Sequence, residues 1–150
     1  MNIKKEYKYI LHKIEEVTRN IDLTQSNNLL KIIKLTKLKD KLNCIDYWDR
    51  FEPNISKPYS ILNTDRENDK GNGTHWVGVF QEGKKMYIYD SFARKNVMNR
   101  FCEEMEKQGY KCRYTNKKGD QQSYMIDCGL RSLLWLLFVD KYGILQASKI

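Results

Sequence analysis

The stretch that most constrains the fold of this chain is GDQQSYMIDCGLRSLLWLLF at residues 119–138, which begins polar and ends as one of the most apolar parts of the sequence. Its apolar part predicts a helix that runs from Cys128 to about Tyr142 and packs on the rest of the domain. Free backbone N–H groups and the helix dipole favour a negative charge in the first turn of a helix. Cys128 therefore occupies a position that favours a thiolate.

The remainder of the sequence predicts an α+β domain. Apolar residues at helical spacing indicate amphipathic helices, and short runs rich in aromatic and β-branched residues indicate strands. The expected helices cover residues 3–19, 26–42 and 93–109, the last with a glycine cap, and the expected strands cover 59–63, 74–80, 85–90 and 110–115. The segment between, 44–58, is interpreted as irregular. This order predicts a mostly antiparallel central sheet with the Cys128 helix packed on it.

A chain of 150 residues fits one domain, and we expect residues 1–150 to form it, with a helical part at 1–45 and a core at 58–142. The charged N-terminus lacks the features of a secretory signal, and no apolar run has the length of a membrane span. These features predict an intracellular protein that is not secreted and makes no membrane contact.

The charge and the metal-ligating residues are not concentrated in any motif. Four cysteines and two histidines are scattered without close pairs, so we expect reduced thiols and no metal site. The net charge of +8 favours polyanions without specifying base recognition, and lysine-rich solvated faces explain it equally well. DNA is therefore a candidate partner on charge alone.

Three residues have the chemistry of a nucleophile, a base and an orienting carboxylate. A nucleophilic cysteine at position 128 needs a base, and His75 on a strand is a better candidate than His12, which lies among lysines on a surface helix. Asp90 ends the neighbouring strand, and a hairpin brings it to the imidazole of His75. Each residue alone also has an ordinary structural explanation: a buried cysteine, a half-buried histidine and a turn aspartate.

Two further residues complete the expected site. The side-chain amide of Gln122 and the backbone N–H of Cys128 are candidate donors for an oxyanion hole. Gly129 has no Cβ, so it lets a substrate approach the start of the helix.

The blocks GTHW, YIYDSF and DQQSYMIDCG occur in this order and resemble those of the adenovirus-type endopeptidase (adenain) and the proteases that remove SUMO. The resemblance covers residues 58–142 and implies a papain-type cysteine protease fold without a cofactor. It implies that His75 is the general base, Asp90 its orienting partner, Gln122 an oxyanion donor and Cys128 the nucleophile. Trp76 and Gly129 match the positions after the histidine and the cysteine, beside a narrow channel for glycine. The adenovirus enzyme has a glutamate and a gap one residue longer, which leaves Gln121 open as the donor.

The compact chain and its helical N-terminal part look most like capsid maturation proteases of large DNA viruses and virophages. This resemblance implies cleavage of viral precursor proteins after small residues, in Gly-Gly or Gly-Xaa-Gly sites. It also implies a host-cell cytoplasmic or viral-factory location, packaging in the virion, and DNA or a viral peptide as candidate activators.

Two alternatives stay open. The first is a deubiquitinase or SUMO protease acting on host modifiers. The second is a non-catalytic basic module that binds DNA or a protein partner. The short tail after the apolar helix means that substrate recognition does not transfer with the mechanism.

Overall fold

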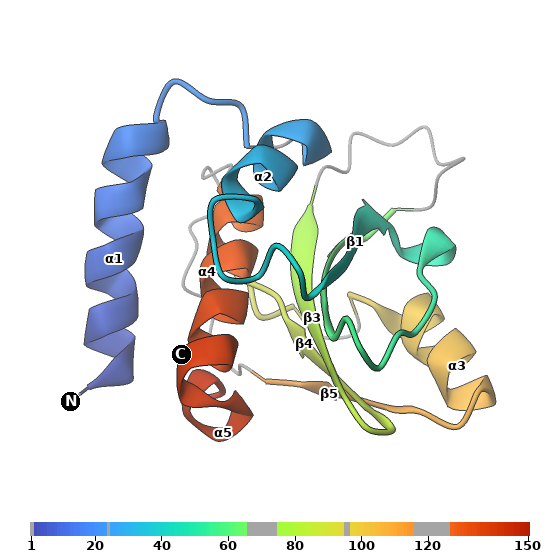
Figure 1. Ribbon diagram of the computed structural model, residues 1–150. Helices are drawn as coiled ribbons and strands as arrows, with labels where there is room; N and C mark the ends of the chain where they lie inside the picture. Colours follow the sequence, from blue (N-terminus) through green and yellow to red (C-terminus); the bar gives the residue numbers. More distant parts are fainter. Residues whose placement is uncertain (1, 24, 66–74, 95–96, 116–126) are drawn as a thin grey trace.

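A mixed sheet lies at the centre of the molecule (Figure 1). The computed structural model describes residues 2–23, 25–65, 75–94, 97–115 and 127–150. The strands follow the order β1-β2-β3-β4-β5 and are β1 (Leu42–Tyr47), β2 (Tyr59–Asn63), β3 (Trp76–Glu82), β4 (Lys85–Tyr89) and β5 (Lys111–Tyr114). The inner pairs β2–β3 and β3–β4 are antiparallel, whereas β1–β2 and β4–β5 are parallel. The α+β class is confirmed, but the prediction of a mostly antiparallel sheet is wrong.

The main difference from the sequence prediction lies between residues 34 and 50. The second helix, α2 (Ser26–Ile33), ends well before the predicted boundary, and the hydroxyl of Thr36 donates to the Ile33 carbonyl at 2.7 Å. Such side-chain bonds to the backbone compete with helix continuation. The chain then forms β1 and the short helix η1 (Trp48–Arg50), where we expected irregular structure.

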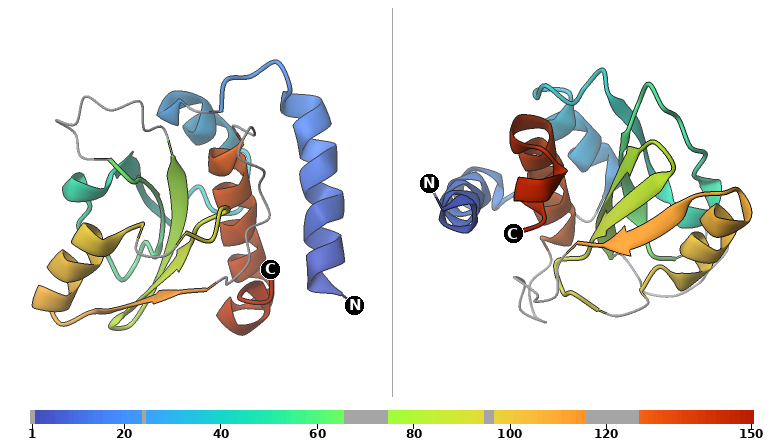
Figure 2. Two further views of the ribbon diagram at one scale, coloured as in Figure 1. Left: turned by 180° about the vertical axis from the view of Figure 1, so that it is seen from behind. Right: turned by 90° about the horizontal axis from the view of Figure 1, so that it is seen from below.

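The sheet is covered on both faces (Figures 1 and 2). On one face, α3 (Asn99–Lys107) and η1 pack on the apolar side chains that β3 and β4 direct to that side. On the other face lies α4 (Cys128–Tyr142), followed by the short α5 (Ile144–Ala147). The predicted hairpin and the α4 helix are confirmed. A helix also forms within the predicted range 93–109, but α3 begins only at Asn99, and Gly109 has the positive φ of +90° expected of a cap.

The apolar helix α4 lies between the sheet and two N-terminal helices, α1 (Ile3–Thr18) and α2 (Figures 1 and 2). On the sheet side, Gly78 allows a close approach, because a Cβ there would lie 3.1 Å from the ring of Trp135. Burial from both sides explains why almost every position of α4 is apolar. The same arrangement fixes the first turn of α4, which carries Cys128, at one end of the sheet.

Candidate active site

His75 and Asp90 lie together at the end of the β3–β4 hairpin. His75 directly precedes β3 and Asp90 directly follows β4, and antiparallel pairing brings these two ends to the same edge. The Nε2 atom of His75 lies 2.5 Å from Oδ1 of Asp90. The backbone N–H of Thr64 donates to the His75 carbonyl at 3.0 Å, which ties the histidine to the end of β2. The structure thus brings together the two residues that the sequence paired.

Asp90 is held as a carboxylate. Its side chain is fully buried, which alone would raise the pKa of Asp90. The hydrogen bond and the charge of His75, together with the backbone N–H groups of Phe92 and Arg94, outweigh burial and hold that pKa below its ordinary value. The two N–H groups donate to the carboxylate at 3.1 and 3.0 Å. The ring of Phe92 lies 5.0 Å from the imidazole of His75, between centroids, and helps to fix its orientation.

Cys128 lies in the first turn of α4 against the residue that follows His75. The backbone N–H of Trp76 donates to Sγ of Cys128 at 3.4 Å, and Cys128 is only 5% exposed. Burial raises the pKa of the Cys128 thiol, and the N–H groups of Trp76 and Gly129 offset this rise only in part. The expectation that the helix start alone favours a thiolate is therefore wrong, because desolvation of the sulfur is the larger effect.

Because burial raises the pKa of the Cys128 thiol, ionisation of this thiol near neutral pH would need a neighbouring base. Nε2 of His75 is engaged by Asp90, so a proton transferred to this imidazole would have to bind Nδ1. An ionised carboxylate on Nε2 stabilises the imidazolium that results. An imidazole paired with a carboxylate and a thiol in the first turn of α4 therefore lie at the same end of the sheet.

The other predicted residues have different outcomes. Trp76 is buried in the core with α4, so its known contribution to the site is its backbone N–H, and its role in substrate binding stays a prediction. Gln122 and Gln121 lie outside the described residues. Among the residues that are described, no group of His, Cys, Asp and Glu could hold a metal ion, and no helix is long and apolar enough to cross a membrane.

Gly129 makes room for the protein itself. A Cβ at this position would lie 2.8 Å from the carbonyl oxygen of Leu23 and 2.9 Å from the side chain of Leu29. The space that we assigned to a substrate is therefore filled by the chain that leads into α2. Gly129 lets this chain pack against the start of α4.

We expect Gly129→Ala to destabilise the fold by about 1 to 3 kcal/mol, because the Leu23 backbone cannot yield as a flexible side chain can. The free energy of unfolding in urea measures this effect. Adding Leu29→Ala should recover only part of the loss, because the clash with the backbone persists. An unchanged free energy of unfolding in Gly129→Ala would contradict the close packing.

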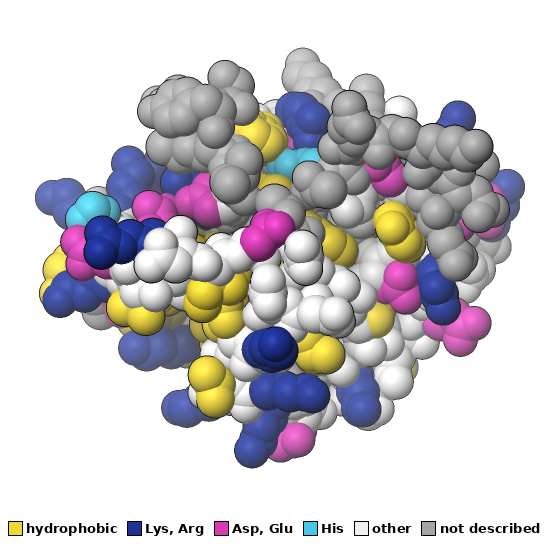
Figure 3. All heavy atoms as spheres, turned by 90° about the horizontal axis from the view of Figure 1, so that it is seen from above, with side chains coloured by type: hydrophobic (Ala, Val, Ile, Leu, Met, Phe, Trp, Pro, Cys, Tyr) yellow, Lys and Arg dark blue, Asp and Glu magenta, His cyan; other side chains and the backbone are white. Residues whose placement is uncertain are grey.

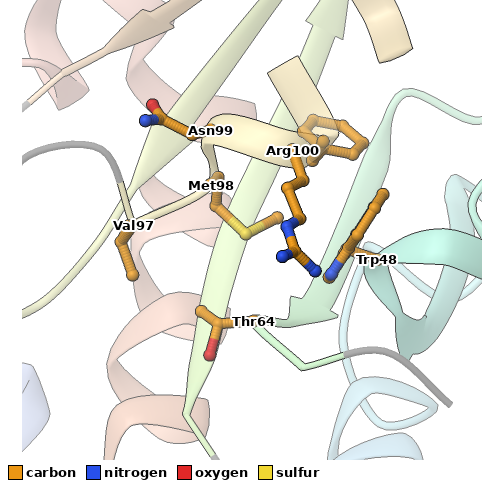
Figure 4. Close-up of a pocket in the computed structure, with 7 residues that line it drawn as sticks. Trp48, Thr64, Val97, Met98, Asn99 and Arg100 are labelled. Atoms are coloured by element: carbon orange, nitrogen blue, oxygen red, sulfur yellow. The ribbon is translucent and has the colours of Figure 1, made fainter. Parts of the chain in front are cut away.

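A pocket opens on the α3 side of the sheet, at the same end as His75 (Figure 4). It has a volume of about 290 Å³ and is lined by Trp48, Thr64, Val97, Met98, Asn99, Arg100 and Phe101. Thr64 connects it to the histidine through the backbone bond described above. Figure 4 shows the guanidinium of Arg100 beside the indole of Trp48, over the Met98 side chain. The pocket lining thus combines apolar side chains with one guanidinium.

The sequence analysis missed the residues that support Asp90. Phe92 and Arg94 donate their backbone N–H groups to Asp90, which no residue type reveals, and Nε of Arg94 also lies 3.5 Å from Oδ2 of Asp90. The signal that could have found them is the aspartate at a strand end, since such residues commonly accept hydrogen bonds from the backbone two residues further on.

The described side chains at this end of the molecule carry both signs of charge. Figure 3 views this end from above, and its Lys and Arg side chains lie around the described part of the face together with Asp and Glu side chains. Contact with DNA stays a prediction from the net charge.

No protein-family model and no curated protein sequence matches this chain. The likeness to the adenovirus-type and SUMO-removing proteases therefore rests on the matched residues themselves. Of these, the structure brings His75, Asp90, Trp76 and Cys128 to one end of the sheet.

Proposed function

We propose that the protein is a cysteine endopeptidase of the adenain type, in which Cys128 is the nucleophile and His75 and Asp90 activate it. The observation that carries this proposal is the pair of contacts at one end of the sheet. His75 bonds to a buried carboxylate, and the next residue along the chain donates its N–H to the sulfur of Cys128. Nucleophile, base and orienting group are the parts that such catalysis requires.

The proposed reaction proceeds through an acyl-enzyme. His75 takes the thiol proton, and the sulfur of Cys128 attacks the peptide carbonyl carbon to give a tetrahedral oxyanion. The backbone N–H of Cys128 and the side-chain amide of Gln122 or Gln121 are the proposed donors to that oxyanion. The C–N bond breaks as the imidazolium protonates the leaving amine, and a thioester remains. Water, deprotonated by His75, then attacks the thioester and releases the acid and the thiol.

The proposed substrates are viral precursor proteins cut after glycine, in the host cell or the virion, with DNA or a viral peptide as candidate activators. These assignments rest on the sequence resemblance. The thiol of Cys128 is only 5% exposed, which is consistent with a small residue such as glycine next to the cleaved bond.

The test is the mapping of new N-termini after incubation of the protein with a denatured proteome in reducing buffer, with and without DNA. We expect cuts after glycine that vanish in Cys128→Ala, and their dependence on DNA would identify it as an activator. Ubiquitin and SUMO carrying a C-terminal electrophile form the second arm. If adducts formed at Cys128 and no proteome protein were cut, the protein would be a modifier-specific protease and not an endopeptidase. Absence of both cuts and adducts would contradict the proposal.

A further inference from the structure

A buried charged cluster joins α1 to the first turn of α4. The guanidinium of Arg131 lies 3.0 Å, through Nε, from Oδ1 of Asp127, and 3.6 Å, through an Nη atom, from a carboxylate oxygen of Glu15. Arg131 is 5% exposed although it lies in an almost wholly apolar helix. Burial of a guanidinium costs free energy unless its N–H groups are hydrogen-bonded. The carboxylates of Asp127 and Glu15 supply partners for Arg131 and offset this cost.

The same turn of α4 is fixed by a second contact to α1. The hydroxyl of Tyr7 donates to the Arg131 carbonyl at 3.2 Å and lies 3.0 Å from the hydroxyl of Tyr89. Tyr89 is the last residue of β4, immediately before Asp90. Helix α1 therefore contacts both the helix that carries Cys128 and the strand that leads to Asp90.

Glu15 belongs to this charged cluster, and its carboxyl group shares a hydrogen bond with that of Asp127. Burial, followed by the hydrogen bond and the negative charge of Asp127, raises the pKa of Glu15 to about 7, against the opposing charges of Arg131 and His12. A folded-state pKa above the ordinary value means that folding takes up a proton. The stabilising contribution is complete below the ordinary pKa and is lost as the pH rises through about 7.

We therefore expect Glu15→Gln, which stays neutral, to gain stability relative to the native chain as the pH rises. Thermal unfolding midpoints at about pH 5 and about pH 8 measure this difference, which should be larger at the higher pH. Exposure of the Glu15 side chain limits its size. Parallel curves for the two proteins would contradict the shared proton.

Asp127 connects this cluster to the nucleophile. It directly precedes Cys128, and its negative charge acts to raise the pKa of the thiol, so that the thiolate forms less readily. The adjacent guanidinium of Arg131 balances that charge and holds the carboxylate on the α1 side. Removal of the guanidinium would leave an uncompensated negative charge next to the sulfur.

We propose that Arg131 is a positioning residue for Cys128, whose buried guanidinium holds and neutralises the Asp127 carboxylate and so keeps the thiol able to ionise. The inference rests on the proposed function for its catalytic meaning. The effect of these charges on ionisation of the Cys128 thiol can be measured without any substrate.

The experiment is the pH dependence of Cys128 alkylation by iodoacetamide, measured by peptide mass spectrometry so that the other cysteines do not contribute. Arg131→Gln should slow alkylation at about pH 7 by roughly 3- to 10-fold, through a shift of the profile to higher pH. Arg131→Lys, which keeps the positive charge, should stay close to the native profile. Asp127→Asn added to Arg131→Gln should restore most of the rate.

A second variant covers the case in which Arg131→Gln does not fold. Asp127→Asn alone removes the negative charge that directly precedes Cys128 and keeps the guanidinium, so it should speed alkylation at about pH 7 by up to roughly 10-fold. A slower or unchanged rate in this variant would overturn the proposal, as would an unshifted profile in folded Arg131→Gln.

Tyr142→Phe is the matched control. The Tyr142 hydroxyl donates to the Glu6 carboxylate at 2.7 Å, so its loss loosens α1 from the far end of α4 without changing charge near Cys128. We expect lower stability and an unchanged alkylation profile, and a shifted profile would count against a charge effect. If His75 did not affect the reactivity of Cys128, only the proposed function would be contradicted. The comparison between the Arg131 and Asp127 variants would still be valid, because it does not require His75 to act as a base.

Discussion

Cys128→Ala should abolish peptide cleavage, by roughly 10⁴-fold or more, while the fold is retained. The sulfur is the only atom in the proposed mechanism that forms a covalent bond with the substrate. Cys128 is nearly buried, but the change removes one atom from a first helical turn that is also held by contacts of Gly129 and Arg131. Initial cleavage rates on a glycine-containing peptide found in the proteome test measure the loss of activity. Circular dichroism and thermal unfolding measure whether the fold is retained.

Cys102→Ala is the matched control. Cys102 is also a buried free cysteine, but it lies in α3 on the opposite face of the sheet. A hydrogen bond from Cys112 lowers the pKa of the Cys102 thiol, so labelling is measured by peptide mass spectrometry, which distinguishes the two cysteines. We expect full cleavage activity in Cys102→Ala. Activity that persists in Cys128→Ala, or disappears in Cys102→Ala, would rule out Cys128 as the nucleophile.

The parts of the fold that the sequence predicted are those with a strong local pattern. The helix from Cys128 is mostly apolar because it is buried from both sides, and the β3–β4 hairpin has two nearly continuous apolar strands around a glycine with a φ of +59°. The strand β1 was missed because it is only partly buried, at the edge of the sheet, and carries polar residues such as Asn43 and Asp46 without clear alternation.

The candidate site was predictable as a set of residue types, but its electrostatics were not. The order of His75, Asp90 and Cys128 along the chain led to the contacts seen at the end of the sheet. The direction of the thiol pKa was wrong, because burial of Cys128 comes from packing of segments distant in sequence. The contact of Arg131 with Glu15 is likewise long-range, and no local pattern predicts which carboxylate a lone arginine in an apolar helix will meet.

His75→Ala should reduce peptide cleavage by roughly 10²- to 10⁴-fold, the range expected for loss of a general base. Since burial raises the pKa of the Cys128 thiol, loss of the imidazole leaves this thiol without its proposed base. Alkylation of Cys128 at about pH 7 should fall as well, and it should recover toward the native rate as the pH rises and the thiol ionises unaided. This partial recovery distinguishes a lost base from a collapsed site.

His12→Ala provides the control for His75, because His12 lies exposed on α1 and pairs with Glu16. Its cleavage and alkylation rates should equal those of the native protein. Asp90→Asn tests the orienting partner: the backbone N–H bonds of Phe92 and Arg94 to position 90 can persist, but the negative charge that stabilises the imidazolium is lost. If His75→Ala lowered cleavage and Asp90→Asn left it unchanged, the 2.5 Å contact would be structural and His75 would act without a carboxylate.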